Sequence, residues 1–329
     1  MTANCTDAPT AVPSDAGVAG VGVLLSFIVT AAVSLVISAS LIFQEWRGNA
    51  KPSVLRRKLL NAYSDQQILT GIGIQSVGIA KTDSMVPYHF FIVWMLSLLS
   101  MAVHNAALLA LVHDFRRDWV LRWMRQFLMF VNLVLSCVYG VYILQAVREG
   151  LSNSTLPVSC VWDDSDSEGP ANGAGVSYFL TVAVIAGNVI VFALSTWYLH
   201  NRAQKFYRVI QTVGLVIMTA FSIGAVVRVS LLADAFANPP IKLSDSGEQQ
   251  WSFGQLLSVG MLLLPLVSVV EILRGEIKCA LPVQDVGDDK ARLLGEGQGD
   301  ELQPAGSGQV RGSFQPNPLW GSQEYMFRK

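Results

Sequence analysis

Long apolar runs constrain this chain more than any other feature. A helix needs about 20 apolar residues to cross the hydrocarbon core of a bilayer. The chain is 52% hydrophobic and 14% charged, whereas soluble proteins average about 25% charged residues. Six runs have at least 21 residues, at 18–43, 86–112, 127–147, 176–199, 209–233 and 253–273. We therefore expect an all-α, multi-pass membrane protein.

A seventh, weaker span is predicted over 64–80. Ser64 and Gln67 have the spacing of a capping box, in which each side chain bonds a free amide at a helix start, so the helix is expected to begin there. Its apolar part, 68–80, is short, and the whole segment rises only about 25 Å at 1.5 Å per residue. This helix needs neighbours to stay in a membrane.

Three residues of that helix form a small and polar stripe. Gly71, Gln75 and Gly78 fall at positions i, i+4 and i+7, which lie on one helix face. Small residues let helix backbones approach closely, and a helix contact hides the amide from lipid. We predict that the stripe is a helix-packing surface.

Basic residues predict the orientation. With seven spans, the loops on one side carry twelve Lys and Arg residues, and Arg274 and Lys278 directly follow the last span, which makes fourteen; the loops on the other side carry Lys81, Arg148 and Lys242. Such a bias places the basic loops in the cytoplasm. Without the second span, the two most basic loops would fall on opposite sides.

The predicted architecture is a seven-transmembrane-helix bundle with its N-terminus outside. It has a short outer segment at 1–17, a membrane domain at 18–274, and a cytoplasmic disordered tail at 275–329 that is rich in Gly, Gln, acidic residues and Pro. Trp320, Tyr325 and Phe327 near the end could form a motif for a cytoplasmic partner, although an unstructured end with incidental aromatics is favoured.

The outer loop between the fourth and fifth spans suits a luminal or extracellular face. It contains an N-glycosylation sequon at Asn153 and four acidic residues between 163 and 168. Cys160 in this loop and Cys5 share the oxidising side and are a possible disulfide. Cys279, just past the last span, is a possible palmitoylation site, with a free thiol favoured. No cysteine spacing indicates a metal, and no cofactor is predicted.

Polar residues inside the spans are candidate functional residues because they are costly in lipid. The residues whose depths allow them to meet in the inner half of the bundle are His104, Asn105, Asn132, Asn188 and Glu271. A His–Glu pair there could relay a proton or hold a cation. Hydrogen bonding that fixes helix packing is the alternative, and we favour it.

Arg228 is the one basic residue placed inside a span, near the outer end of the sixth. It is a candidate site for an anionic ligand. A side chain that reaches the headgroups or the acidic outer loop is the favoured alternative.

The segment from Ser64 resembles a group of multi-pass membrane proteins from filamentous fungi. The group is typified by SDQQ-x-x-TG, a His-Phe pair opening the next span and a histidine near that span's inner end, which match 64–71, His89 with Phe90, and His104. Asn105 departs from the group pattern, which has a small apolar residue there. The resemblance implies the topology and a fungal source, and it carries no activity.

The sequence leaves the functional class open. Seven spans with an outer N-terminus also resemble G-protein-coupled receptors, but the last span has neither NPxxY nor a lysine for retinal. A proton-coupled or small-solute transporter is the alternative, although no inverted repeat is evident. A membrane-embedded enzyme is third, because only His104 and Glu271 could act in catalysis. A receptor or sensor in the plasma membrane or a secretory-pathway membrane is favoured, with no nucleic-acid partner because the net charge is −1.

Overall fold

The computed structural model describes residues 5–47, 53–112, 115, 119–149, 151, 154–162, 174–200, 206–237 and 239–274. Asn153, Cys279, the side chain of Glu271 and the segment 275–329 lie outside the described residues. The described chain is helical, and its only strand-like pairing is an isolated bridge between Val12 and Leu243.

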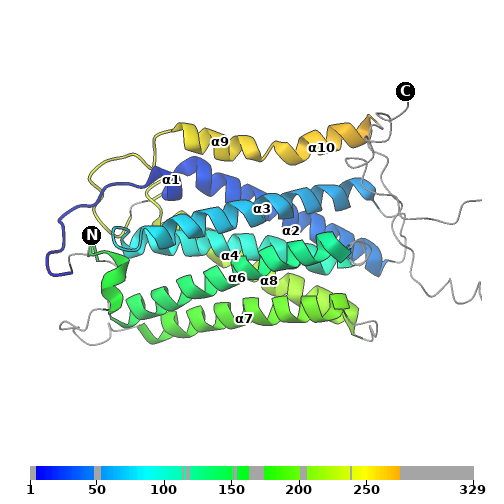
Figure 1. Ribbon diagram of the computed structural model, residues 1–329, viewed down its shortest axis with the longest axis horizontal. Helices are drawn as coiled ribbons and strands as arrows, with labels where there is room; N and C mark the ends of the chain where they lie inside the picture. Colours follow the sequence, from blue (N-terminus) through cyan, green and yellow to red (C-terminus); the bar gives the residue numbers. More distant parts are fainter. Residues whose placement is uncertain are drawn as a thin grey trace, which may run out of the picture. The chain divides into compact units, whose positions relative to one another are not determined.

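The helices lie side by side along the length of a bundle (Figure 1). The long ones are α2 (Val21–Trp46), α3 (Val54–Ala80), α4 (Pro87–Ala110), α6 (Trp119–Arg148), α7 (Ala174–His200) and α8 (Tyr207–Leu232). The short ones are α1 (Ala16–Ala19), α9 (Phe253–Met261), α10 (Leu264–Leu273) and the 3-10 helix η2 (Val158–Trp162).

Five helical segments of the described chain are long and apolar enough to cross a membrane. They are Ala16–Trp46, Pro87–Ala110, Arg122–Arg148, Ser177–His200 and Tyr207–Leu232. This confirms a helical bundle with the character of a membrane protein. The seven-span count stays a prediction, because α3 is too polar to qualify and the last apolar run is split into α9 and α10.

Helix α4 lies at the centre of the bundle. All of its residues except Phe91 are buried, and it packs against α2, α3, α6, α7 and α8. A helix that is apolar around its whole circumference is expected to be enclosed on every side. The polar residues of α4 are therefore held in the interior.

The predicted start of the second span is wrong. Helix α3 begins at Val54, where the Ser53 side chain accepts a hydrogen bond from the Arg56 amide, and it runs without interruption to Ala80. Ser64 and Gln67 are interior positions of this helix and are almost fully buried. Tertiary packing overrides the capping pattern, because both side chains lie against neighbouring helices and not at a free helix end.

The glycine stripe of α3 does lie at helix contacts. A Cβ added at Gly71 would collide with Ser100 Oγ of α4 and lie 3.0 Å from Asn132 Oδ1 of α6, and one at Gly78 would collide with the Tyr139 hydroxyl of α6. Nothing lies within 4 Å of a Cβ added at Gly73, on another face. On α3, the close approach of neighbouring helices therefore requires glycine at positions 71 and 78 but not at position 73.

The last apolar run is broken at Leu262 and Leu263. Their amides bond to carbonyls three residues back, at 3.0 Å each, and Pro265 follows in the first turn of α10. Proline has no amide hydrogen and its ring clashes with the carbonyl four residues earlier. The break therefore lies directly before Pro265.

The two ends of the bundle differ in chemistry. A disulfide joins Cys5 to Cys160 at one end, which we call the disulfide end. The other, the basic end, carries Arg56 of α3 and Arg125 of α6. On α7, exposed Phe179 and exposed Trp197 are 18 residues apart, about 27 Å at 1.5 Å per residue. This spacing approaches the thickness of a hydrocarbon core of about 30 Å, with aromatic rings at both interfaces.

Candidate functional site

A cavity runs along one flank of the bundle between α1, α2, α3 and α9. Its volume is about 350 Å³, at the small end of the range for ligand pockets. Helix α3 and its C-terminal cap line its whole length, from Gln66 at the middle of the helix to Lys81 at the disulfide end. Those residues are about 22 Å apart along the helix axis at 1.5 Å per residue. We call this cavity the slot.

The slot has polar residues at its two ends and a mostly apolar wall between them, with Ser26 and Ser258 each bonded to a carbonyl of its own helix. Gln66, Gln67 and Thr70 lie at one end, and Asp15 and Lys81 lie at the other. The apolar wall is formed by Val18, Val23, Phe27, Ile74, Val77 and Met261. Such a lining fits a ligand with an apolar body and a polar group.

Gln67 is the polar residue of the slot that most needs a partner. It is only 2% exposed, and its Oε1 atom has no hydrogen-bond partner among the described residues. The Oε1 atom of neighbouring Gln66 is also buried without a partner. A buried amide oxygen without a bond costs about 1–3 kcal/mol, so a ligand that bonds Gln67 would remove this penalty.

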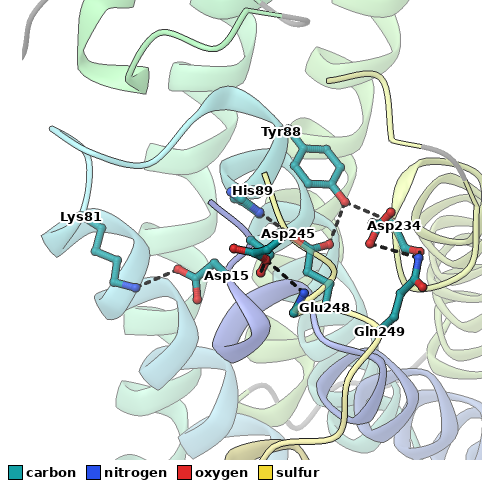
Figure 2. Close-up of polar contacts among 10 residues, drawn as sticks. Asp15, Lys81, Tyr88, His89, Asp234, Asp245, Glu248 and Gln249 are labelled. Carbon is teal, nitrogen blue, oxygen red and sulfur yellow. Dashed lines mark hydrogen bonds and ion pairs between the residues drawn. The ribbon is translucent and has the colours of Figure 1, made fainter. Parts of the chain in front are cut away.

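An ion pair lies at the disulfide end of the slot. Lys81 Nζ is 2.7 Å from Asp15 Oδ2, and Figure 2 shows the two side chains reaching toward each other from neighbouring segments. Asp15 precedes α1 and Lys81 follows α3. This contact bridges the slot between two elements that both line it.

Helix α9 forms another wall of the slot. A buried glutamine, Gln255, bonds it to α2. Gln255 Oε1 accepts a hydrogen bond of 3.1 Å from the Gly22 amide, and Gln255 Nε2 donates to the Gln250 carbonyl at 2.9 Å. A Cβ added at Gly20 or Gly22 would collide with Gln255. These glycines therefore permit the close approach of α9.

A buried carboxylate fastens the segment between α8 and α9 to α4. Glu248 is fully buried; its Oε1 atom is 2.7 Å from His89 Nε2 and its Oε2 atom accepts a 3.0 Å bond from the Tyr88 hydroxyl. The Tyr88 hydroxyl also accepts from the Asp234 amide at 2.9 Å. Gln249 Nε2 donates to Asp234 Oδ2 at 3.2 Å. Figure 2 shows this group, which we call the end clasp.

Two carboxylates near the clasp have pKa values shifted in opposite directions. Burial raises the pKa of Asp234, with the charge of Glu248 acting in the same direction. Hydrogen bonds from Ser14 and from the Gly247 amide lower the pKa of Asp245. A raised carboxyl pKa favours the folded state as the pH falls, whereas the stability contributed by Asp245 is lost as the pH falls through its folded pKa.

A second polar group lies in the interior, between α3, α4 and α6. Gln75 Nε2 donates to Asn132 Oδ1 at 2.6 Å, and Asn132 Nδ2 donates to Ser100 Oγ at 3.2 Å. Ser100 Oγ donates to the Gln67 carbonyl at 2.9 Å and lies 3.0 Å from His104 Nε2. These five residues form the interior network.

Ser100 and His104 have the separation of a nucleophile and a base, but their surroundings favour packing. Both are fully buried, and Ser100 already donates its hydroxyl hydrogen to Gln67. His104 Nε2 must then carry the hydrogen of their bond, which leaves Nδ1 without a partner among the described residues. A general base would need the opposite arrangement.

The other predicted intramembrane residues are not bonded to this network. Asn105 Nδ2 lies 3.3 Å from the Met218 sulfur of α8, and Asn188 donates to the Val184 carbonyl of its own helix at 3.0 Å. Arg228 is exposed on α8 near the disulfide end, between exposed Val227 and Leu231. Of the predicted set, the structure joins His104 to Asn132 through Ser100.

Sequence reasoning missed the residues of the slot and of the end clasp. Gln67 was interpreted only as a cap, and Glu248 lies in a polar connection of ordinary appearance. One available signal was the single lysine directly after the second span, Lys81, which could pair with an acidic residue before the first span. No pattern connects Glu248 to His89, 159 residues away.

The described residues contain no group of three or more His, Cys, Asp or Glu side chains that could hold a metal ion. No protein family model, curated protein or solved structure matches the sequence. The site must therefore be interpreted from its own geometry.

Proposed function

We propose that this chain is a receptor-like membrane protein that binds a small ligand in the slot. The observation that carries the proposal is the position of Gln67. Its side chain lines the slot and its Oε1 atom has no partner among the described residues, while its backbone carbonyl accepts the hydrogen bond from Ser100. A ligand bonded to this amide would act on a residue that belongs to the interior network.

The arrangement of the polar residues favours a receptor over a transporter or an enzyme. Gln75, Ser100, His104 and Asn132 do not line the slot. They bond to one another, so they are placed to fix helix packing and to respond to its change.

The proposed topology has seven spans, with the N-terminus and the disulfide end outside the cytoplasm. The Cys5–Cys160 disulfide supports this orientation, because disulfides form in oxidising compartments. The aromatic residues at both ends of α7 support a membrane position. A plasma-membrane or secretory-pathway location is consistent with both.

Filling the slot tests the proposal. Gly73 lines the slot, and nothing lies within 4 Å of a Cβ added to it. Gly224 of α8 is equally open but does not line the slot, so Gly73→Trp and Gly224→Trp are matched variants. The probe is octanol, added to the full chain in lipid nanodiscs, with the melting temperature as the readout.

Binding to the folded state raises the melting temperature. We expect octanol to stabilise the wild type and Gly224→Trp more than Gly73→Trp, because octanol's effect on the bilayer is common to all three. An equal octanol response in Gly73→Trp and the wild type would overturn the proposal.

A further inference from the structure

We infer that the ligand of the slot is a single-chain amphiphile with an uncharged hydroxyl or amide group, which bonds Gln67 and lays its chain toward Lys81. This inference rests on the proposed function and specifies the chemistry of the same site.

The dimensions of the slot favour a single chain. Its volume of about 350 Å³ is distributed along about 22 Å of α3. A small volume distributed along this length makes the cavity long and narrow, a shape that favours one extended chain over rings fused side by side or two parallel chains.

The lining decides which way the chain runs. Between the two polar ends, the wall is mostly aliphatic and aromatic, with Phe27, Ile74 and Val77 in the middle. At the Lys81 end, the polar groups are already engaged with each other in the 2.7 Å ion pair. The unpartnered groups are the amides at the other end, so the polar group of the ligand belongs there.

The amide of Gln67 selects an uncharged group. An amide can both donate and accept a hydrogen bond, as a hydroxyl or another amide can. An ionic headgroup would need an opposite charge at this end to offset its desolvation. Lys81, the cation that lines the slot, lies at the far end and is paired with Asp15.

The ligand would enter from the bilayer. Val77 lines the slot and is 46% exposed on the flank of the bundle, and Gly73 is exposed one turn away. In a membrane this flank faces lipid chains. A single-chain amphiphile already dissolved in the bilayer can reach the slot sideways, without passing the ion pair.

A chain series on matched variants tests this inference. The probes are tetradecanol, tetradecane and tetradecanoate, added to the full chain in nanodiscs, with bound probe counted by native mass spectrometry. Gln67→Leu removes the amide. Gln126→Leu is the control, because Gln126 is also a buried glutamine with an unpartnered amide but does not line the slot.

We expect tetradecanol to bind the wild type and Gln126→Leu equally, and Gln67→Leu about tenfold more weakly, which is the loss expected for one hydrogen bond. Tetradecane should bind all three alike and more weakly than tetradecanol binds the wild type. Removing an unpartnered buried amide costs little stability, so Gln67→Leu should melt at or above the wild-type temperature.

The two proposals fail in different ways. Equal tetradecanol affinity in Gln67→Leu and the wild type, or tighter binding of tetradecanoate than of tetradecanol, would overturn the amphiphile inference while the Gly73→Trp result still supported the slot. Tetradecanol binding that Gly73→Trp leaves unchanged would overturn both.

Discussion

At the residue scale, single polar side chains decide how the helices are joined. Gln255 attaches α9 to α2, Ser100 connects three helices, and Glu248 holds the connection before α9 against α4. Each of these side chains is fully buried. A buried polar group is stabilising only while its partners remain in place. Removing one partner should therefore lower the stability of the protein measurably.

Glu248→Ala should destabilise the protein by about 3 kcal/mol, because it leaves the buried His89 and Tyr88 side chains without their shared acceptor. Glu248→Gln should cost less, since its amide oxygen can still accept from Tyr88. Lys242→Ala, an exposed residue of the same connection, should change stability by less than about 0.5 kcal/mol. Thermal unfolding of the purified proteins measures all three, and equal losses for Glu248→Ala and Lys242→Ala would contradict the clasp.

At the element scale, α3 is the long helix whose sequence is least apolar, so it depends on its contacts with neighbouring helices. It packs against α2, α4, α6 and α10. Its close approach to α6 depends on Gly78, over which the Tyr139 hydroxyl lies while donating to the Gln75 carbonyl at 2.8 Å. We therefore expect added side-chain volume to be destabilising on the face of α3 that carries Gly78. On the open face, helix propensity should decide the effect of a substitution.

Gly71→Ala and Gly78→Ala should each lower the stability by about 1–3 kcal/mol, because the added methyl group overpacks the contact with α4 or α6. Gly73→Ala adds the same methyl group where space is open, so it should raise the stability by about 0.5–1 kcal/mol through helix propensity. Melting temperatures in detergent compare the three variants directly. A similar change in all three would show that the stripe is not a packing surface.

At the scale of the whole molecule, the proposed orientation places the disulfide end and the basic end in two different compartments. The disulfide joins the N-terminal segment to the connection after α6, and Thr155 of that connection donates to the Pro9 carbonyl at 2.7 Å. If the disulfide end faces an oxidising compartment, then the N-terminus and Asn153 must face it too.

A tag on the N-terminus should therefore be accessible from outside intact cells, or be enclosed within sealed secretory vesicles. Asn153→Gln should remove the part of the protein's mass that a glycosidase releases from the wild type. Cys5 and Cys160 should react with a thiol reagent only after reduction. An N-terminal tag that is accessible only from the cytoplasm, with Cys5 reactive before reduction, would contradict the orientation.

The sequence by itself determined the all-α class and five of the six long apolar helices that it predicted, because a run of more than 20 apolar residues has few stable alternatives to a membrane helix. It also singled out Gly71 and Gly78, since small residues at helical spacing are useful only at a contact. Each of these properties belongs to a single segment, so the local sequence pattern is enough to predict it.

Only the tertiary structure decided where α3 begins, that α4 is central, and that Gln67 lies between the slot and Ser100. The partners in these contacts are far apart in the chain: 33 residues separate Gln67 from Ser100, and 159 separate His89 from Glu248. A pattern within one helix shows which of its faces is polar. Which neighbour meets that face depends on how all the helices pack around α4, and this arrangement turned a predicted helix cap into the residue of the candidate ligand site.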